Sequence, residues 1–267
     1  MKNRILRAIF IALFALCQIS YAADKNTATV FAAASMQTAL DDIISQFKKE
    51  NPDYEIRSNY DSSGTLATQI TAAGGADIFI SASKKAMDKV SDFLAANSRY
   101  DLLENKLVAI MPANKQSPPL TGADEATNTK LLMAWIVTGK MLSIGNYAGD
   151  SPVPAGEYAY NLLNSYDANF FNVLTKQGKL SLAQNVTAVL TQVATGAADI
   201  GFVYSTDAAT RPNDVKIILS LTPLTKIIYP AAVLKDGANK PAVKSFFEYL
   251  KSQKAKDTLT KYGFSVL

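Results

Sequence analysis

Short strands alternate with helices from residue 27 onward, and this order constrains the fold more than any other feature of the sequence. Three strands are predicted in the first part of the chain, at Thr27 to Ala32, Glu55 to Tyr60 and Ala76 to Ile80. A predicted helix fills each interval, and the first carries Leu40, Ile43, Ile44 and Phe47 at helical spacing. A β-α-β-α-β order implies a largely parallel sheet with helices on both faces.

The middle of the chain repeats this order. Leu107 to Met111 and Met141 to Ile144 are predicted strands, and helices are predicted around residues 131–137, after Pro154 and after Asn185. The run Gly-Ala-Ala-Asp-Ile-Gly-Phe-Val-Tyr at 196–204 also echoes Gly-Gly-Ala-Asp-Ile-Phe-Ile-Ser at 74–81. Small residues followed by Asp are common where a helix joins a buried strand, so the echo alone is suggestive. We interpret it as a sign of two similar α/β lobes.

The last segment returns to the first lobe in this interpretation. Ile227 to Leu234 is a predicted strand, and Ala242 to Tyr262 is a predicted amphipathic helix that needs an existing lobe to pack on. Residues 23–106 plus 220–267 would then form lobe 1, and residues 107–219 would form lobe 2. The predicted fold is α/β, with two doubly wound lobes joined by two crossover strands. Ligands favour the cleft between two such lobes.

The first 22 residues have the pattern of a cleaved secretory signal. Lys2, Arg4 and Arg7 precede an apolar run from Ala8 to Leu16, and small residues surround a cut before Ala23. The run is too short for a membrane anchor, which needs roughly 20 apolar residues. Lipid attachment at the following cysteine would require a small residue where Leu16 stands. We therefore expect the mature protein to be secreted across the membrane.

Composition excludes several classes of function. The chain has 27 Lys and Arg against 23 Asp and Glu, and three of the cations belong to the signal, so the mature balance is 24 − 23 = +1. A charge so close to zero argues against nucleic acid as a partner. The single cysteine also lies in the signal, so no disulfide is expected. The chain has no histidine, which excludes Ser-His-Asp and Cys-His catalysis and imidazole metal sites.

Several predicted helices begin in small or polar segments that follow strands. These segments are Ser35, Ser62-Ser63, Pro154-Ala155-Gly156 and Asn185-Val186. Helix starts present unpaired N–H groups and the positive end of the helix dipole, so several of them around one point would bind a small oxyanion without Lys or Arg. Each Ser or Asn could equally be an ordinary helix cap. Tyr204 could likewise be a packing aromatic with a satisfied hydroxyl.

Five motifs, taken in order, closely resemble the molybdate-binding periplasmic proteins of ABC importers. They are Thr-Val-Phe-Ala-Ala-Ala-Ser-Met at 29–36, Ser-Ser-Gly-Thr-Leu at 62–66, Ala-Asp-Ile-Phe-Ile-Ser-Ala at 76–82, Val-Pro-Ala-Gly at 153–156 and Gly-Phe-Val-Tyr-Ser-Thr-Asp-Ala at 201–208. The resemblance runs from about residue 27 to Phe264. It implies the type II periplasmic-binding-protein fold, whose two lobes close on a tetrahedral dianion.

The resemblance also implies which residues hold the anion. By motif, Ser35 and Ser63 match the two serines of the family, Ala155 and Val186 match the two backbone amides, and Tyr204 matches the tyrosine. No metal ion would be bound directly, and no cofactor is expected. The implied protein is a monomeric receptor, not an enzyme, that captures molybdate, and also tungstate, and delivers it to the membrane permease of an ABC importer.

The sequence departs from the family pattern at two places, and both bear on the assignment of these residue roles. The stretch between Ile144 and Val153 is longer than usual, which affects where the Ala155 amide lies. Asp61 stands before the serine pair, where the family tends to have a small or apolar residue. An inward-facing carboxylate would disfavour a full dianion and could accept a proton from hydrogen phosphate, whereas an outward-facing one would cap the helix.

Other functions stay open from the residues alone. The ligand could be sulfate or phosphate, or a ferric ion held by tyrosines, although Tyr204 is the one cleft tyrosine that the sequence identifies. A secreted hydrolase using Asp61 and Asp150 as acid and base is a further alternative. It has less support, because no paired-carboxylate pattern stands out.

Overall fold

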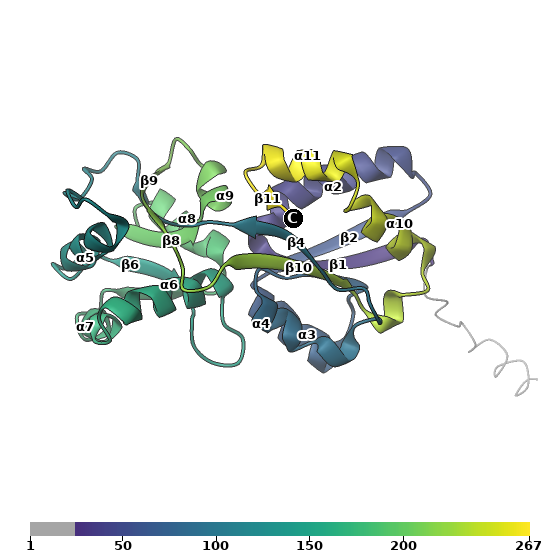
Figure 1. Ribbon diagram of the computed structural model, residues 1–267, viewed down its shortest axis with the longest axis horizontal. Coiled ribbons are helices and arrows are strands. Elements are labelled where there is room, and N and C mark those ends of the chain that lie inside the picture. The colour runs from purple at the N-terminus through teal and green to yellow at the C-terminus, as the bar shows by residue number, and fades with distance from the viewer. Residues whose placement is uncertain (1–24) are drawn as a thin grey trace, which may run out of the picture.

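The computed structural model describes residues 25–267, so the predicted signal, residues 1–22, lies outside the described residues. Figure 1 shows two lobes side by side along the long axis, each a β-sheet with helices on both faces. We use lobe 1 for the six-stranded sheet with its helices and lobe 2 for the five-stranded sheet with its helices. Within the described range, no helix combines the length and apolar character that crossing a membrane requires.

Lobe 1 contains both ends of the described chain. Its sheet has the order β11-β4-β10-β3-β1-β2. The strands are β1 (Thr27–Ala33), β2 (Glu55–Asp61), β3 (Ile78–Ile80), β4 (Tyr100–Asn105), β10 (Ile227–Val233) and β11 (Ser265–Val266). The helical elements are η1 (Ala34–Met36), α2 (Gln37–Glu50), α3 (Ser63–Ala73), α4 (Lys84–Asp88), η2 (Ser91–Phe93), η3 (Lys235–Gly237), α10 (Pro241–Tyr249) and α11 (Gln253–Lys261).

Lobe 2 is formed by the middle of the chain. Its sheet has the order β7-β6-β8-β5-β9. The strands are β5 (Leu107–Pro112), β6 (Leu142–Gly145), β7 (Leu180–Ala183), β8 (Ile200–Tyr204) and β9 (Val215–Leu221). The helices are α5 (Glu125–Ile136), α6 (Pro154–Tyr166), α7 (Phe170–Lys176), α8 (Val186–Ala194) and α9 (Ser205–Ala209).

The sheets are mixed, which corrects the expectation of largely parallel sheets. Strands β1, β2 and β3 pair in parallel, as do β6, β7 and β8. In contrast, β10 is antiparallel to β3 and β4, and β5 is antiparallel to β8 and β9. These antiparallel strands belong to the two places where the chain passes between lobes, from β4 to β5 and from β9 to β10 (Figure 1). A strand that arrives from the other lobe enters the sheet at the end where the parallel strands finish, so it runs antiparallel to them.

The Ala-Asp-Ile echo has a structural meaning in both lobes. The side chain of Asp77 accepts a hydrogen bond from the backbone N–H of Thr29 at 2.8 Å. Asp199 accepts one from the backbone N–H of Met141, also at 2.8 Å. In each lobe an aspartate just before a buried strand thus fixes the start of a neighbouring segment. The prediction of two similar α/β lobes is confirmed.

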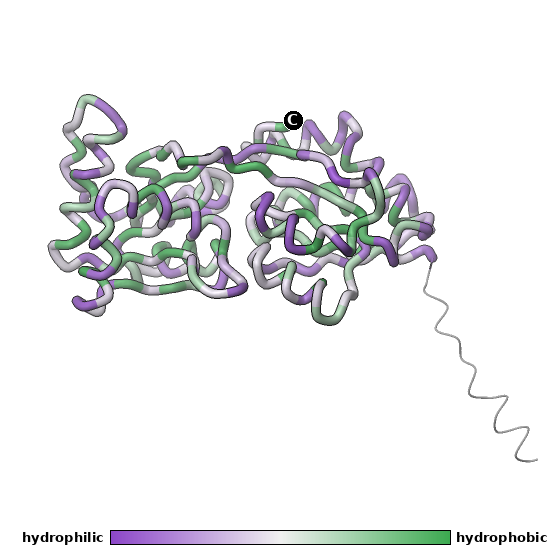
Figure 2. The backbone as a smooth tube through the Cα atoms, turned by 60° about the horizontal axis from the view of Figure 1, so that its bottom comes forward, coloured by the Kyte–Doolittle hydropathy of each residue, from purple (hydrophilic) through white to green (hydrophobic). Residues whose placement is uncertain are grey.

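The predicted helix from Ala242 to Tyr262 is wrong in one respect, because it is two helices. Helix α10 ends at Tyr249, and Ser252 then caps α11 by accepting a hydrogen bond from the N–H of Ala255 at 3.3 Å. Both helices bury an apolar face on lobe 1, so the apolar spacing continues across the break. Figure 2 shows the same arrangement throughout the molecule, with apolar residues along the inner strands and hydrophilic residues on outer helices and loops.

Candidate functional site

Four segments that begin helices meet at one small cavity between the lobes. The cavity is small, with about 200 Å³ of space between atoms. It suits a small ion better than a larger organic ligand. All five residues predicted from the sequence are among those that line it, which are Ala33, Ala34, Ser35, Asp61, Ser62, Ser63, Ala82, Val153, Pro154, Ala155, Val186 and Tyr204.

The two serines at the start of α3 have different tasks. The Ser62 hydroxyl caps the helix by accepting a hydrogen bond from the N–H of Thr65 at 3.1 Å. The Ser63 hydroxyl is completely buried and accepts a hydrogen bond from the N–H of Ala82 at 2.8 Å. Because its oxygen already accepts, the Ser63 hydroxyl keeps its proton free to donate toward the cavity.

Ser35 does not cap a helix, contrary to the sequence prediction. It lies within the short turn η1, and α2 begins only at Gln37 without a side-chain cap. Its hydroxyl lies 2.8 Å from that of Tyr229, which also accepts a hydrogen bond from the Asn105 side chain at 3.3 Å. When Tyr229 donates to Ser35, the Ser35 proton is free for a ligand. Tyr229 and Asn105 are thus supporting residues that the sequence motifs did not reveal.

Lobe 2 supplies backbone N–H groups at the starts of α6 and α8. Ala155 and Val186 are in the first turns of these helices, where no carbonyl of the same helix reaches their N–H groups. Asn185 caps α8 through the N–H of Ala188 at 2.9 Å, which confirms the predicted cap. The start of α6 packs directly on β6, since a Cβ atom added at Gly156 would lie 2.0 Å from the carbonyl oxygen of Gly145. This close approach fixes the position of the Ala155 amide.

The hydroxyl of Tyr204 is buried and has no hydrogen-bond partner within the described part of the chain. The alternative of a packing aromatic with a satisfied hydroxyl is therefore wrong. Burial holds the pKa of Tyr204 well above its usual value, and the nearby hydroxyl of Tyr229 acts in the same direction. Tyr204 consequently keeps its proton near neutral pH. A buried donor without a partner is costly, and an anion in the cavity would remove that cost.

Asp61 is the one charged side chain among the described residues that line the cavity, and no lysine or arginine joins it. One of its carboxylate oxygens accepts hydrogen bonds from the N–H of Ser62 at 2.7 Å and from the side chain of Asn185 at 3.3 Å. The first bond supports the start of α3 and the second links lobe 1 to lobe 2. This oxygen of Asp61 is therefore occupied by donors of the protein itself, the Ser62 N–H and the Asn185 side chain.

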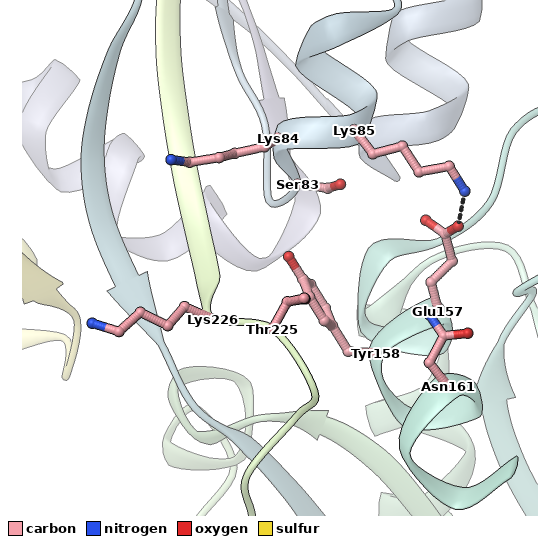
Figure 3. Close-up of a pocket in the computed structure, with 8 residues that line it drawn as sticks. All are labelled: Ser83, Lys84, Lys85, Glu157, Tyr158, Asn161, Thr225 and Lys226. Atoms are coloured by element: carbon pink, nitrogen blue, oxygen red, sulfur yellow. Dashed lines mark hydrogen bonds and ion pairs between the residues drawn. The ribbon is translucent and has the colours of Figure 1, made fainter. Parts of the chain in front are cut away.

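A larger cavity, with about 750 Å³ of space, is lined by residues of both lobes, among them Ser83 and Tyr158 (Figure 3). Each of its three lysines has a carboxylate partner: Lys85 pairs with Glu157 across the lobes at 2.5 Å, Lys84 pairs with Asp101 and Lys226 pairs with Glu104. In Figure 3, Lys84 and Lys226 extend away from Tyr158. Burial, assisted by Glu157, raises the pKa of Tyr158 to about 12. This cavity therefore offers no uncompensated cation to an anion.

Comparison with known proteins shows the family to which the chain belongs. A family model described as "Bacterial extracellular solute-binding protein" matches residues 28–265. The chain belongs to this family. Among curated members, the molybdate-binding protein ModA of Escherichia coli (strain K12) is 37% identical over 264 residues, which cover 95% of this chain and 97% of ModA.

Solved structures agree with the family's fold. The substrate-binding domain assigned to a molybdenum ABC transporter of Clostridium difficile is 29% identical, with a TM-score of 0.62 over 90% of this chain and 99% of that domain. The periplasmic molybdate-binding protein of Azotobacter vinelandii has a TM-score of 0.70 at 24% identity, over 90% of this chain and 99% of its own. The predicted α/β fold with two lobes is confirmed.

Proposed function

We propose that this solute-binding protein captures molybdate, and tungstate as a close chemical analogue, and delivers it to the membrane permease of an ABC importer. The observation that carries the proposal is the unpartnered Tyr204 hydroxyl, buried at the wall of a cavity rich in donors and without lysine or arginine among its described lining residues. The 37% identity to a molybdate-binding protein over almost the whole chain supports the same ligand.

The donor set favours an unprotonated tetrahedral dianion. Up to seven groups could donate: the hydroxyls and amides of Ser35 and Ser63, the amides of Ala155 and Val186, and the hydroxyl of Tyr204. Charge-assisted bonds contribute roughly 1.5–3 kcal/mol each, and desolvation of the anion and ordering of the lobes offset much of the total. A net of about 8–12 kcal/mol corresponds to micromolar to nanomolar binding.

The protein would act in the periplasm after removal of residues 1–22, as a monomer that makes and breaks no covalent bond. Lobe 1 (residues 23–106 plus 220–267) and lobe 2 (residues 107–219) would each move as a unit and close over the anion. Two connections between the sheets support this division, because they leave the lobes free to rotate about a narrow hinge.

Calorimetric titration of the mature protein with molybdate, tungstate, sulfate and phosphate tests the proposal. We expect micromolar or tighter binding of molybdate and tungstate, weaker binding of sulfate and the weakest binding of phosphate, whose proton finds few acceptors in this cavity. Saturating molybdate should also raise the thermal unfolding midpoint, because a ligand at one hundred times its Kd stabilises the native state by about 2.7 kcal/mol. No heat and no thermal shift with either metal oxyanion would refute the proposal.

A further inference from the structure

The segment between β6 and α6, residues 146–153, is a loop of lobe 2 that reaches toward lobe 1 (Figure 1), and its last residue, Val153, lines the oxyanion cavity. We call this segment the strap. It is held firmly to its own lobe: the N–H of Val153 donates to the carbonyl of Asn146 at 2.7 Å, and the ring of Tyr147 stacks on that of Tyr160 with centroids 4.1 Å apart. The strap is therefore a defined part of lobe 2.

Three contacts join the strap to lobe 1. The hydroxyl of Ser151 lies 2.7 Å from that of Thr68 in α3. The side chain of Lys89, just after α4, donates to the carbonyl of Asp150. The closest contact is at Gly64, where an added Cβ would lie 2.2 Å from the carbonyl oxygen of Pro152.

The Gly64 contact is between two backbones and has no room for a side chain. The three atoms nearest to a Cβ at Gly64 all belong to Ser151 and Pro152 of the strap, at 2.2 to 2.7 Å. Separations below 3.0 Å require something to move, and backbone in a buried contact moves at a high cost. Gly64 also follows Ser63 directly in the first turn of α3, so this contact is formed beside a predicted ligand residue.

We propose that Gly64 and residues 150–152 of the strap are positioning elements that set the affinity for the oxyanion by allowing the two lobes to close fully, without touching the ligand. The inference rests on the proposed function and adds to it. A side chain at residue 64 would hold the strap away from α3. The Ala155 amide, three residues after Pro152, would then lie farther from Ser63. The donors from lobe 1 would still bind the anion, but those from lobe 2 would reach it poorly.

The test is molybdate titration of Gly64→Ala beside the wild-type protein, with Thr71→Ala as the matched control. Thr71 is an exposed residue of the same helix, and its hydroxyl bonds to the carbonyl of Thr68 within α3. We expect Gly64→Ala to bind molybdate at least about tenfold more weakly, a factor that corresponds to 1.4 kcal/mol, and Thr71→Ala to bind like wild type. Small-angle X-ray scattering should show a ligand-induced compaction in wild type that is reduced in Gly64→Ala.

In the ligand-free protein the lobes can separate and relieve the contact at residue 64, so the unfolding midpoint of Gly64→Ala should fall only slightly. The higher helix propensity of alanine offsets part of the loss. If the variant does not fold, a double-mutant cycle of Thr68→Ala and Ser151→Ala decides instead. Both single variants and the double variant should then weaken molybdate binding by the same factor, because each removes the hydrogen bond between Thr68 and Ser151. The other bond of the Thr68 hydroxyl, to the carbonyl of Gly64 at 3.1 Å, lies within α3 and does not join the lobes.

The outcomes separate the inference from the function on which it rests. If wild type binds neither molybdate nor tungstate, the proposed function fails. If wild type binds molybdate and Gly64→Ala binds equally well, or the Thr68 and Ser151 effects multiply independently, the strap has no part in affinity and the inference is overturned.

Discussion

Each lobe buries an aspartate, but the two carboxylates have different surroundings. In lobe 1, Asp77 is 4% exposed, and its oxygens contact the ammonium of Lys240 at 2.9 Å and the N–H of Thr29 at 2.8 Å. In lobe 2, Asp207 is 5% exposed and accepts a hydrogen bond from the N–H of Tyr204 at 3.1 Å, with no cation paired to it in the described chain. Burial raises the pKa of Asp207 to about 7. The two lobes share one architecture, but the buried carboxylate of lobe 1 has a cation partner, whereas that of lobe 2 has a raised pKa and no cation partner among the described residues.

The largest expected effect comes from Asp207→Asn. The pKa of Asp207 rises from 3.8 when unfolded to about 7 when folded, so the folded state holds the proton more tightly. This group therefore costs the wild type stability as the pH rises from about 4 to about 7, and the cost stays constant above that. At about 1.36 kcal/mol per pKa unit, the cost approaches about 4 kcal/mol.

Asparagine can still accept from Tyr204 but has no charge to bury, so Asp207→Asn should gain stability over wild type at pH 8 and match it more closely at pH 5. Urea unfolding of the ligand-free proteins at both pH values measures this. Equal pH dependence in wild type and Asp207→Asn would mean that burying the Asp207 carboxylate does not cost stability.

Asp77→Ala and Asp199→Ala compare the two copies of the Ala-Asp-Ile motif. Removing Asp77 leaves the partly buried Lys240 without its partner, and breaking such a pair costs about 3 kcal/mol. Removing Asp199 leaves only the N–H of Met141 unpaired, at about 1 kcal/mol. Chemical denaturation at pH 7 gives both values, and similar losses would contradict the special role of the lysine.

Ser63→Ala and Tyr204→Phe compare the hydroxyls that the lobes offer to the ligand. Each should weaken molybdate binding by about tenfold or more. Only Ser63→Ala should also lower the stability of the ligand-free protein, by about 1–2 kcal/mol, because it leaves the N–H of Ala82 unpaired. Tyr204→Phe removes a hydroxyl without a partner, so its ligand-free stability should be unchanged or higher. Calorimetry and thermal unfolding together check the pair; a destabilised Tyr204→Phe would mean that the hydroxyl is already satisfied.

Local chemistry made the starts of α3 and α8 predictable from the sequence, whereas α2 begins without the expected cap at Ser35 and α5 begins at Glu125, earlier than the predicted 131–137. Asn185 caps α8 through a bond to a residue three positions away, and Ser62 caps α3 in the same way. Such bonds depend on neighbouring residues alone, so their positions were correct. The strands β4, β7, β9 and β11 were not predicted, since they are short or mix polar with apolar residues and form only where a neighbouring strand pairs with them.

Contacts between distant parts of the chain could not be predicted. The partner of Ser35 is Tyr229, 194 residues away on β10, and no local pattern connects the two. The strap is a similar case: its unusual length was visible between Ile144 and Val153, but its contact with Gly64 depends on how the lobes meet. The roles of Ser35, Ser63, Ala155, Val186 and Tyr204 in binding stay predictions, although the structure gathers them around one cavity.

The amides at residues 155 and 186 belong to the main chain, which every amino acid except proline provides equally. Lobe 2 can therefore change its side chains at these two positions and keep the same donors, provided that α6 and α8 begin where they do now. Related proteins could thus share a ligand while their side chains differ at two of the five predicted ligand residues. A search for invariant side chains would overlook these two backbone donors.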